Sequence, residues 1–202
     1  MINFKTIMKL LINSTCTMME NILKEIQQFA DKSHGSQMRK YSPERYIVHP
    51  VRVMELCRQY DSRLPILAAA LLHDVLEDTP VNEQELLSFL ETLLTKEEAE
   101  EALSLVKELT DVYIKEEYPQ WNRRKRKQME LERIRQTSPD SQTIKYADII
   151  DNCNEIAAND PDFAPRFLKE CLANLRVADQ GNSTLHKIAL DKVEGELKNI
   201  YD

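Results

Sequence analysis

Glycine is scarce in this sequence, and long apolar runs are missing. With 3 glycines and 8 prolines among 202 residues, there are too few turn-forming residues for an all-β sandwich. The same scarcity argues against a glycine-rich loop that cradles phosphates. No stretch approaches the roughly 18 consecutive apolar residues of a membrane-spanning helix. We therefore expect no membrane partner.

Positive charge and cysteine are also limited. The formal net charge of −7 argues against nucleic acid or an anionic membrane as the main partner. The 4 cysteines, at positions 16, 57, 153 and 171, have no metal-binding spacing and do not form the dense pattern of a disulfide framework. We expect a reduced, cytoplasmic protein. The sequence sets no oligomeric state.

Helical periodicity is what the sequence does have, along almost its whole length. Segment 64–74 is apolar nearly all round, which indicates a helix buried at the centre of the fold. A composition of 42% hydrophobic and 30% charged residues suits one soluble domain of this size. We predict an all-α, single-domain helical bundle over residues 18–202, with no strand.

The first 17 residues differ from the rest. Their apolar patch, 7–12, is interrupted by Lys9 and followed by polar residues, so it lacks the apolar core and cleavage site of a signal peptide. A regular amphipathic pattern begins only at Met18. We expect residues 1–17 to be a disordered or non-native extension.

The segment His73-Asp74-Val75-Leu76-Glu77-Asp78 carries the most chemical information. It follows directly on the buried apolar run, and buried ionisable groups have to be paired or bind a metal. On a helix, His73 and Glu77 lie one turn apart, as do Asp74 and Asp78. The alternative is that His73 belongs to a hydrogen-bond network of the core while the acidic residues face solvent.

Two more residues complete a candidate metal site. His49 precedes Pro50 at the start of a predicted helix, and Asp148 is enclosed by apolar neighbours. Taken singly, the first is as readily a helix cap and the second a solvent-facing carboxylate. Together with His73 and Asp74 they make a set of two imidazoles and two carboxylates, which suits Mn²⁺, Fe²⁺ or Zn²⁺.

These residues belong to four blocks that resemble a known family. The blocks are Ala30-x-x-x-His34-Gly35-x-Gln37-x-Arg39-Lys40, Tyr46-Ile47-x-His49-Pro50, Ala68-Ala69-Ala70-Leu71-Leu72-His73-Asp74-x-x-Glu77-Asp78-Thr79 and Lys145-x-Ala147-Asp148-x-x-x-Asn152. In order and spacing they are similar to the HD superfamily of metal-dependent phosphohydrolases. Within it they resemble the hydrolase domain of RelA/SpoT-type (p)ppGpp enzymes and the small stand-alone alarmone hydrolases.

The resemblance implies an HD-type fold and a hydrolase that converts (p)ppGpp and water to GDP or GTP and pyrophosphate. It implies that one Mn²⁺ is held by His49, His73, Asp74 and Asp148. Glu77 and Asp78 would orient and deprotonate the attacking water. The substrate would be a guanine nucleotide alarmone or another phosphorylated nucleotide.

The resemblance also implies substrate contacts. Arg39 and Lys40 would hold phosphates, and Asn152 would contact the nucleotide. The basic run 123–127 loosely matches a phosphate-contacting region through Arg124 and Lys125, although such a run is equally typical of a solvated helix face.

The sequence departs from the family pattern beside Asp148. Ile149 stands where the family often has a basic residue, and Asp151 and Glu155 add negative charge near the expected nucleotide. Two other functions therefore stay open. One is the same metal chemistry on a nucleoside monophosphate or NADPH. The other is a nucleotide sensor without turnover, which would have no need of Glu77 and Asp78.

Overall fold

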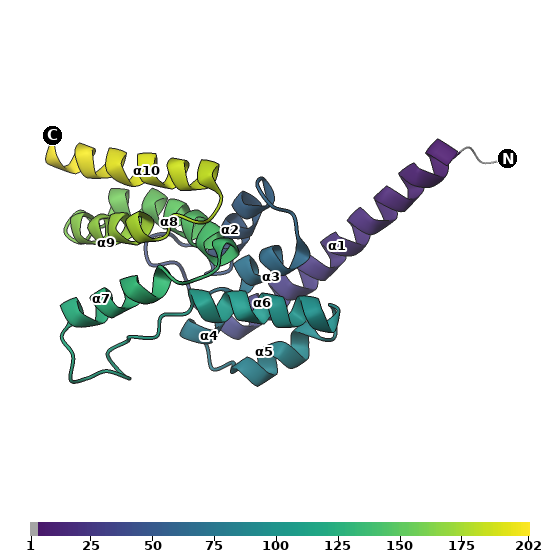
Figure 1. Ribbon diagram of the computed structural model, residues 1–202, viewed down its shortest axis with the longest axis horizontal. Coiled ribbons are helices and arrows are strands. Elements are labelled where there is room, and N and C mark those ends of the chain that lie inside the picture. Colours follow the sequence, from purple (N-terminus) through teal and green to yellow (C-terminus); the bar gives the residue numbers. More distant parts are fainter. Residues whose placement is uncertain (1–3) are drawn as a thin grey trace.

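The structure is a computed structural model that describes the backbone of residues 4–202 and the side chains of residues 17–202. Over this range the chain is helical and has no β-strand, with one isolated bridge between Met38 and Arg45. The helices (Figure 1) are α1 (Phe4–His34), α2 (Val48–Arg58), α3 (Leu64–Leu72), α4 (Val75–Asp78), α5 (Glu83–Leu90), α6 (Lys96–Leu109), α7 (Arg123–Ile134), α8 (Pro139–Asn159), α9 (Ala164–Val177) and α10 (Ser183–Tyr201). The all-α prediction is confirmed.

Helix α1 begins at Phe4, before the start that the amphipathic pattern predicts at Met18. Its side chains join the core from Met19 onward, with Leu23 and Ile26 buried. Residues 1–3 and the side chains of residues 4–16 lie outside the described part of the chain. The proposal that residues 1–17 are an extension to the functional domain rests on their sequence alone.

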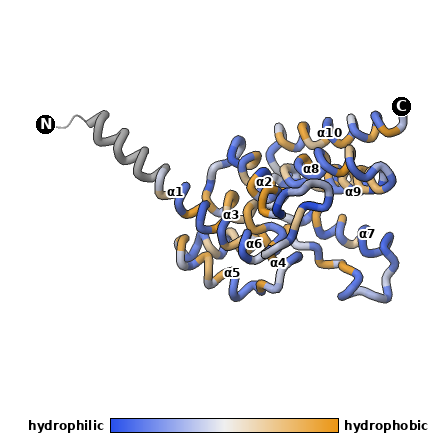
Figure 2. The backbone as a smooth tube through the Cα atoms, turned by 180° about the vertical axis from the view of Figure 1, so that it is seen from behind, coloured by the Kyte–Doolittle hydropathy of each residue, from blue (hydrophilic) through white to orange (hydrophobic). Residues whose placement is uncertain are grey.

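Helix α3 is the central helix that the sequence predicts. Every residue from Pro65 to Leu72 is buried, and α3 packs against α1, α2, α6 and α8. Figure 2 shows this hydrophobic segment among the surrounding helices. Its proline lies in the first turn, where a missing N–H costs nothing. Burying each large apolar side chain stabilises the fold by roughly 1.5–3 kcal/mol. The packing of α3 therefore fixes the position of His73 and Asp74, which follow it.

Helices α8, α9 and α10 pack on one another, and α7 lies against α9. In Figure 1 they form one end of the molecule, with α4, α5 and α6 on the other side of α3. Helix α8 spans both parts, because it also contacts α2, α3 and α6. Ser138 caps its start by accepting a hydrogen bond from the Ser141 N–H, as expected of serine at this position.

The chain does not continue as one helix through His73 and Asp74. Helix α3 ends at Leu72, and α4 begins at Val75 after Asp74, whose φ is −96° and ψ −4°. The prediction of one continuous helix from Leu64 through Asp78 is therefore wrong. Across the break the Asp78 N–H still donates to the Asp74 carbonyl oxygen at 2.8 Å. The two carboxylates have different partners, Tyr46 for Asp74 and Gln37 for Asp78.

No helix in the described range combines the length and apolar character needed to cross a membrane.

Candidate metal centre and adjoining cavity

Side chains from three parts of the fold converge beside the end of α3. Ligand atoms of His49, His73 and Asp74 all lie within 4.8 Å of one another. His49 comes from the first turn of α2 and is 1% exposed, and His73 follows the last residue of α3. Asp148 of α8 adds Oδ1 at 3.2 Å from His49 Nε2 and 3.8 Å from His73 Nε2. The four predicted metal ligands are thus brought together.

The His73 ring is oriented by the backbone. Its Nδ1 donates a hydrogen bond to the carbonyl oxygen of Ala70 at 2.8 Å. Its Nε2 is buried without a hydrogen-bond partner among the described residues, yet lies 2.9 Å from Asp74 Oδ2. A buried nitrogen lone pair that faces carboxylate oxygens requires a cation or a proton between them. This donor set therefore fits a divalent metal ion.

The His49 ring is held from behind by Asp151. Its Nδ1 lies 2.7 Å from Asp151 Oδ2, and both side chains are buried. With the proton on Nδ1, His49 presents Nε2 to Asp74 and Asp148, as imidazoles that bind metals commonly do. From the sequence alone, Asp151 is expected to add negative charge near the nucleotide. The structure places it behind a predicted ligand instead.

Hydrogen bonds fix the two carboxylates. The Tyr46 hydroxyl donates to Asp74 Oδ2 at 2.6 Å, and Asn152 Nδ2 donates to Asp148 Oδ1 at 2.6 Å. Lys145 Nζ donates to Asp148 Oδ2 at 2.9 Å.

The same contacts set the protonation of the cluster. Although burial opposes ionisation, the Lys145 ammonium and the two imidazoles hold the pKa of Asp148 well below its usual range. Burial likewise opposes charge on His49, but Asp148, Asp151 and Asp74 raise its pKa to about 9. Without a metal ion the cluster thus keeps ionised carboxylates and attracts protons to the imidazoles. With a metal ion those protons would be displaced.

A cavity of about 220 Å³ adjoins this cluster. Asp74, Asp148 and Asn152 line its metal end. Glu77 also lines it, and its carboxylate accepts a hydrogen bond from the Asp111 N–H at 3.1 Å. Loss of hydration, with the nearby Asp111 and Asp74 carboxylates, raises the pKa of Glu77 to about 7. A carboxyl group with that pKa can exchange protons near neutral pH.

Asp78 does not reach the cavity. Its Oδ2 accepts a hydrogen bond from Gln37 Nε2 at 3.3 Å, which ties α4 to the segment after α1. Glu77 and Asp78 are neighbours on α4, so their side chains point about 100° apart around the helix. Of the predicted catalytic pair, the structure brings only Glu77 to the cavity.

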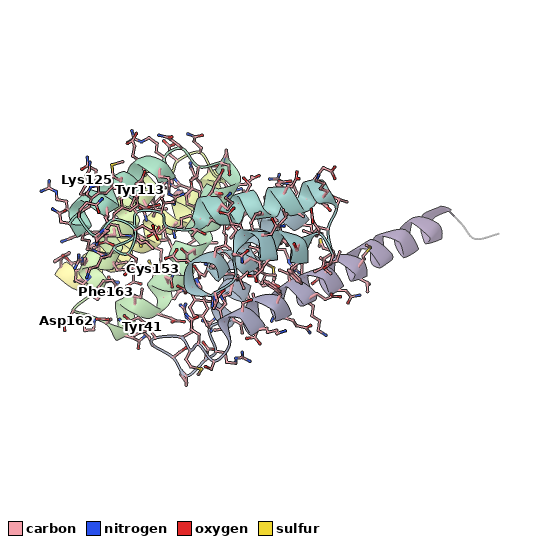
Figure 3. All side chains as sticks on the ribbon, turned by 90° about the horizontal axis from the view of Figure 1, so that it is seen from below. Tyr41, Tyr113, Lys125, Cys153, Asp162 and Phe163 are labelled. Atoms are coloured by element: carbon pink, nitrogen blue, oxygen red, sulfur yellow. The ribbon has the colours of Figure 1, made fainter. Side chains whose placement is uncertain are left out.

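The predicted phosphate ligands Arg39 and Lys40 also lie elsewhere. The Arg39 side chain is 7% exposed and pairs with Glu155 at 3.1 Å, while its Nη2 donates to Asn152 Oδ1 at 3.2 Å. Lys40 is 70% exposed and pairs with Asp160 at 3.1 Å, above the rings of Tyr41 and Phe163 that Figure 3 labels. Arg39 therefore supports Asn152 from behind, and Lys40 ties down a loop.

The side chains of the basic run 123–127 on α7 point in different directions, because successive residues of a helix lie about 100° apart. Arg124 and Lys125 are exposed and do not line the cavity, and Lys125 points outward in Figure 3, with its ammonium over the Trp121 ring. Lys127, to which the sequence assigned no role, lines the cavity. Arg124 and Lys125 thus belong to a solvated helix face.

Three residues contact the candidate ligands although the sequence assigned them no role in the site, namely Tyr46, Lys145 and Asp151. Lys145 and Asp151 were detectable in principle, because each is three residues from Asp148 and so shares its face of α8. Tyr46 had no such local signal, since its partner Asp74 lies 28 positions away.

Comparisons with known proteins agree with this geometry. Residues 46–153 match the model of the HD domain family, which is more than half of the chain. The protein therefore belongs to the HD domain family, and the resemblance drawn from its motifs is confirmed.

Several relatives carry more specific names. The guanosine-3′,5′-bis(diphosphate) 3′-pyrophosphohydrolase MESH1 of Drosophila melanogaster is 30% identical over 68% of this chain and 70% of its own length. The like-named proteins of Spiroplasma citri and Haemophilus influenzae are 44% and 30% identical over 33% and 85% of this chain. This chain spans 9% and 23% of the lengths of those two bacterial relatives.

A solved structure supports the fold. It is described as a metazoan ortholog of SpoT that hydrolyzes ppGpp and plays a role in starvation responses. It aligns with a TM-score of 0.69 over 87% of this chain and 94% of its own, at 24% identity.

Proposed function

We propose that this protein is a Mn²⁺-dependent hydrolase that removes the 3′ pyrophosphate of (p)ppGpp, giving GDP or GTP. The observation that carries the proposal is the buried cluster of His49, His73, Asp74 and Asp148 at the end of a cavity lined by Glu77. The Drosophila relative, of which this chain covers 70%, bears the name of that activity. Zn²⁺ and Fe²⁺ are alternative occupants of the same donor set.

The four ligand residues would hold one divalent ion. When bound, such an ion lowers the pKa of its water and neutralises charge on phosphate oxygens. His49 and His73 keep their protons on Nδ1, through Asp151 and the Ala70 carbonyl, so that both present Nε2.

Glu77 would take a proton from the attacking water. The new bond forms between the water oxygen and phosphorus while the bond from phosphorus to the ribose 3′ oxygen breaks. Glu77 would then pass this proton to the leaving ribose 3′ oxygen, which closes the proton balance. Asn152 would contact the nucleotide, with Arg39 behind it, and Asp78 would act through Gln37 by fixing the segment before Tyr46.

We further propose that residues 18–202 are the catalytic unit and that the protein works in the cytoplasm, in the stringent response. The described cysteines Cys57, Cys153 and Cys171 are free and buried, which suits a reducing compartment.

The charge of the cavity favours a second candidate, a nucleotide with fewer phosphates. The lining contains six acidic side chains, namely Asp74, Glu77, Asp111, Glu130, Asp148 and Glu170, but two lysines. A nucleoside monophosphate or NADPH would meet less repulsion there than ppGpp.

Elemental analysis combined with hydrolysis assays tests the proposal. The purified protein is loaded with Mn²⁺ and given ppGpp, pppGpp, GMP and NADPH. We expect about one metal ion per chain and release of pyrophosphate from ppGpp, both lost in His73→Ala and kept in a surface control, Asp191→Asn. Turnover of GMP or NADPH with intact ppGpp would select the second candidate. Nucleotide binding without any turnover would identify a sensor.

A further inference from the structure

The cavity is poor in cations. Among the described residues, the basic side chains in its lining are Lys127 and Lys145. The arginine and lysine residues assigned to phosphate by resemblance lie outside that lining. A phosphorylated substrate needs positive partners, and in a net acidic protein these have to be local.

Lys145 is the cation closest to the chemistry. Its Nζ is 2.9 Å from Asp148 Oδ2, and Asp148 Oδ1 is 3.2 Å from His49 Nε2. The ammonium thus contacts a candidate metal ligand directly, through the second oxygen of the Asp148 carboxylate. Lys127, in contrast, is 3.4 Å from Asp111 and 41% exposed, whereas Lys145 is 27% exposed.

Lys145 also has donors to spare. An ammonium group has three N–H bonds. Within the part of the chain that the structure describes, that of Lys145 has one hydrogen-bond acceptor, Asp148 Oδ2. The side chain borders the cavity that Glu77 and Asn152 also line. Its remaining donors are available to a ligand oxygen there.

We propose that Lys145 is a catalytic residue whose ammonium binds a non-bridging oxygen of the phosphoryl group that is attacked. This inference rests on the proposed function and names the protein cation for its substrate. In the step, water oxygen bonds to phosphorus and the bond to the ribose 3′ oxygen breaks. Lys145 neither gives nor takes a proton and balances the charge on the phosphoryl oxygens.

A purely structural role would be different. If Lys145 only neutralised Asp148, its removal would change metal affinity or stability and leave each metal-loaded molecule equally active. Substrate affinity and turnover per bound metal therefore separate the two roles.

The test compares Lys145→Met, Lys145→Arg and a control, Lys192→Met. Lys192 pairs with Glu196 at 3.0 Å on α10 and is 31% exposed, so it matches Lys145 in setting but lies outside the cavity lining. For each Mn²⁺-loaded protein we measure metal content, kcat and KM for ppGpp, and the Kd of inorganic pyrophosphate by calorimetry.

We expect Lys145→Met to lower kcat/KM about a hundredfold or more, to weaken pyrophosphate binding, and to retain Mn²⁺. Lys145→Arg should recover part of both, and Lys192→Met should match the wild type. If Lys145→Met keeps wild-type pyrophosphate affinity and turnover per metal, the proposal is overturned. If Lys145→Met does not fold, Lys145→Gln replaces it in the same comparison.

The experiment distinguishes failure of the proposed function from failure of the inference about Lys145. If the wild type leaves ppGpp intact, the substrate assignment falls, while a Lys145-dependent Kd for pyrophosphate still supports phosphate binding by this residue. If the wild type hydrolyses ppGpp and the Lys145 variants do so equally well, the function stands and the inference falls.

Discussion

His49 Nδ1 and Asp151 Oδ2 are 2.7 Å apart inside the protein, although the two residues are separated by 102 positions in the chain. The contact holds one imidazole in the tautomer that a metal needs. Carboxylates in this position typically change metal affinity 10- to 100-fold when they are removed.

We therefore predict that Asp151→Asn weakens Mn²⁺ binding about tenfold or more, because the amide carries no charge to stabilise the metal-bound imidazole. Calorimetric titration of the metal-free protein with Mn²⁺ measures this. The exposed Asp191→Asn variant is the control. An unchanged Mn²⁺ affinity in Asp151→Asn would show that the contact has no role in metal binding.

Glu77→Gln is predicted to lower kcat about a hundredfold without loss of bound metal, since the amide cannot accept a proton from water. In the wild type, activity should rise with pH through about 7, where the Glu77 carboxyl ionises. The variant should lose this step from its pH–rate profile. A variant that keeps the step would assign the ionisation to another group.

The raised pKa of Glu77 also predicts a stability effect. A carboxyl group whose pKa rises from 4.5 to about 7 on folding favours the folded state at low pH. This contribution is complete below pH 4.5 and is lost as the pH rises through 7. In the metal-free protein, the Tm of Glu77→Gln relative to wild type should therefore increase between pH 5 and 8. Thermal scans at several pH values measure it, and a constant difference would contradict the prediction.

Arg39→Met is predicted to lower the free energy of unfolding. Because the Arg39 side chain is buried against Glu155 and Asn152, its removal takes the donor from Glu155 Oε2 and Asn152 Oδ1, at a cost of roughly 1–3 kcal/mol. Arg52→Met, which removes a more exposed partner of the same Glu155, should cost less than about 1 kcal/mol. Urea unfolding compares the two variants. If the two variants are equally stable and Arg39→Met has a much higher KM, Arg39 binds substrate phosphate, as the family resemblance implies.

Alanine substitutions at Gly181 and Gly195 are predicted to have opposite effects on stability. A Cβ at Gly181 would lie 2.6 Å from Tyr146 Cε2 and 2.9 Å from the Thr143 backbone nitrogen, so Gly181→Ala should cost roughly 1–3 kcal/mol. A Cβ at Gly195, within α10, meets nothing within 4 Å, so Gly195→Ala should gain roughly 0.5–1 kcal/mol. Denaturant unfolding measures both. A neutral Gly181→Ala would show that the loop before α10 moves away from α8 easily.

Local patterns predicted much of the fold. The apolar run before His73 predicted the buried central helix α3. The break at Asp74 could not be predicted in this way. Its backbone angles remain near the helical region, and no glycine or proline marks the position.

The site was predictable where chemistry is encoded by residue type. Imidazoles and carboxylates in apolar surroundings pointed to a metal cluster, and His49, His73, Asp74 and Asp148 do converge. The fate of Arg39 was not predictable, because its partner Glu155 is 116 positions away. Only the three-dimensional packing of α8 shows that this arginine is already paired.

The long chain separation between His49 and Asp151 has a consequence for how the protein folds. Local helices form early, whereas contacts between distant segments pay for the closure of a large loop and form late. A partly folded chain with α2 and α3 in place but α8 undocked would have two loosely placed imidazoles and no Asp148 beside them. Tight uptake of the cation should therefore begin only with the last docking events, which makes metal binding a reporter of complete folding.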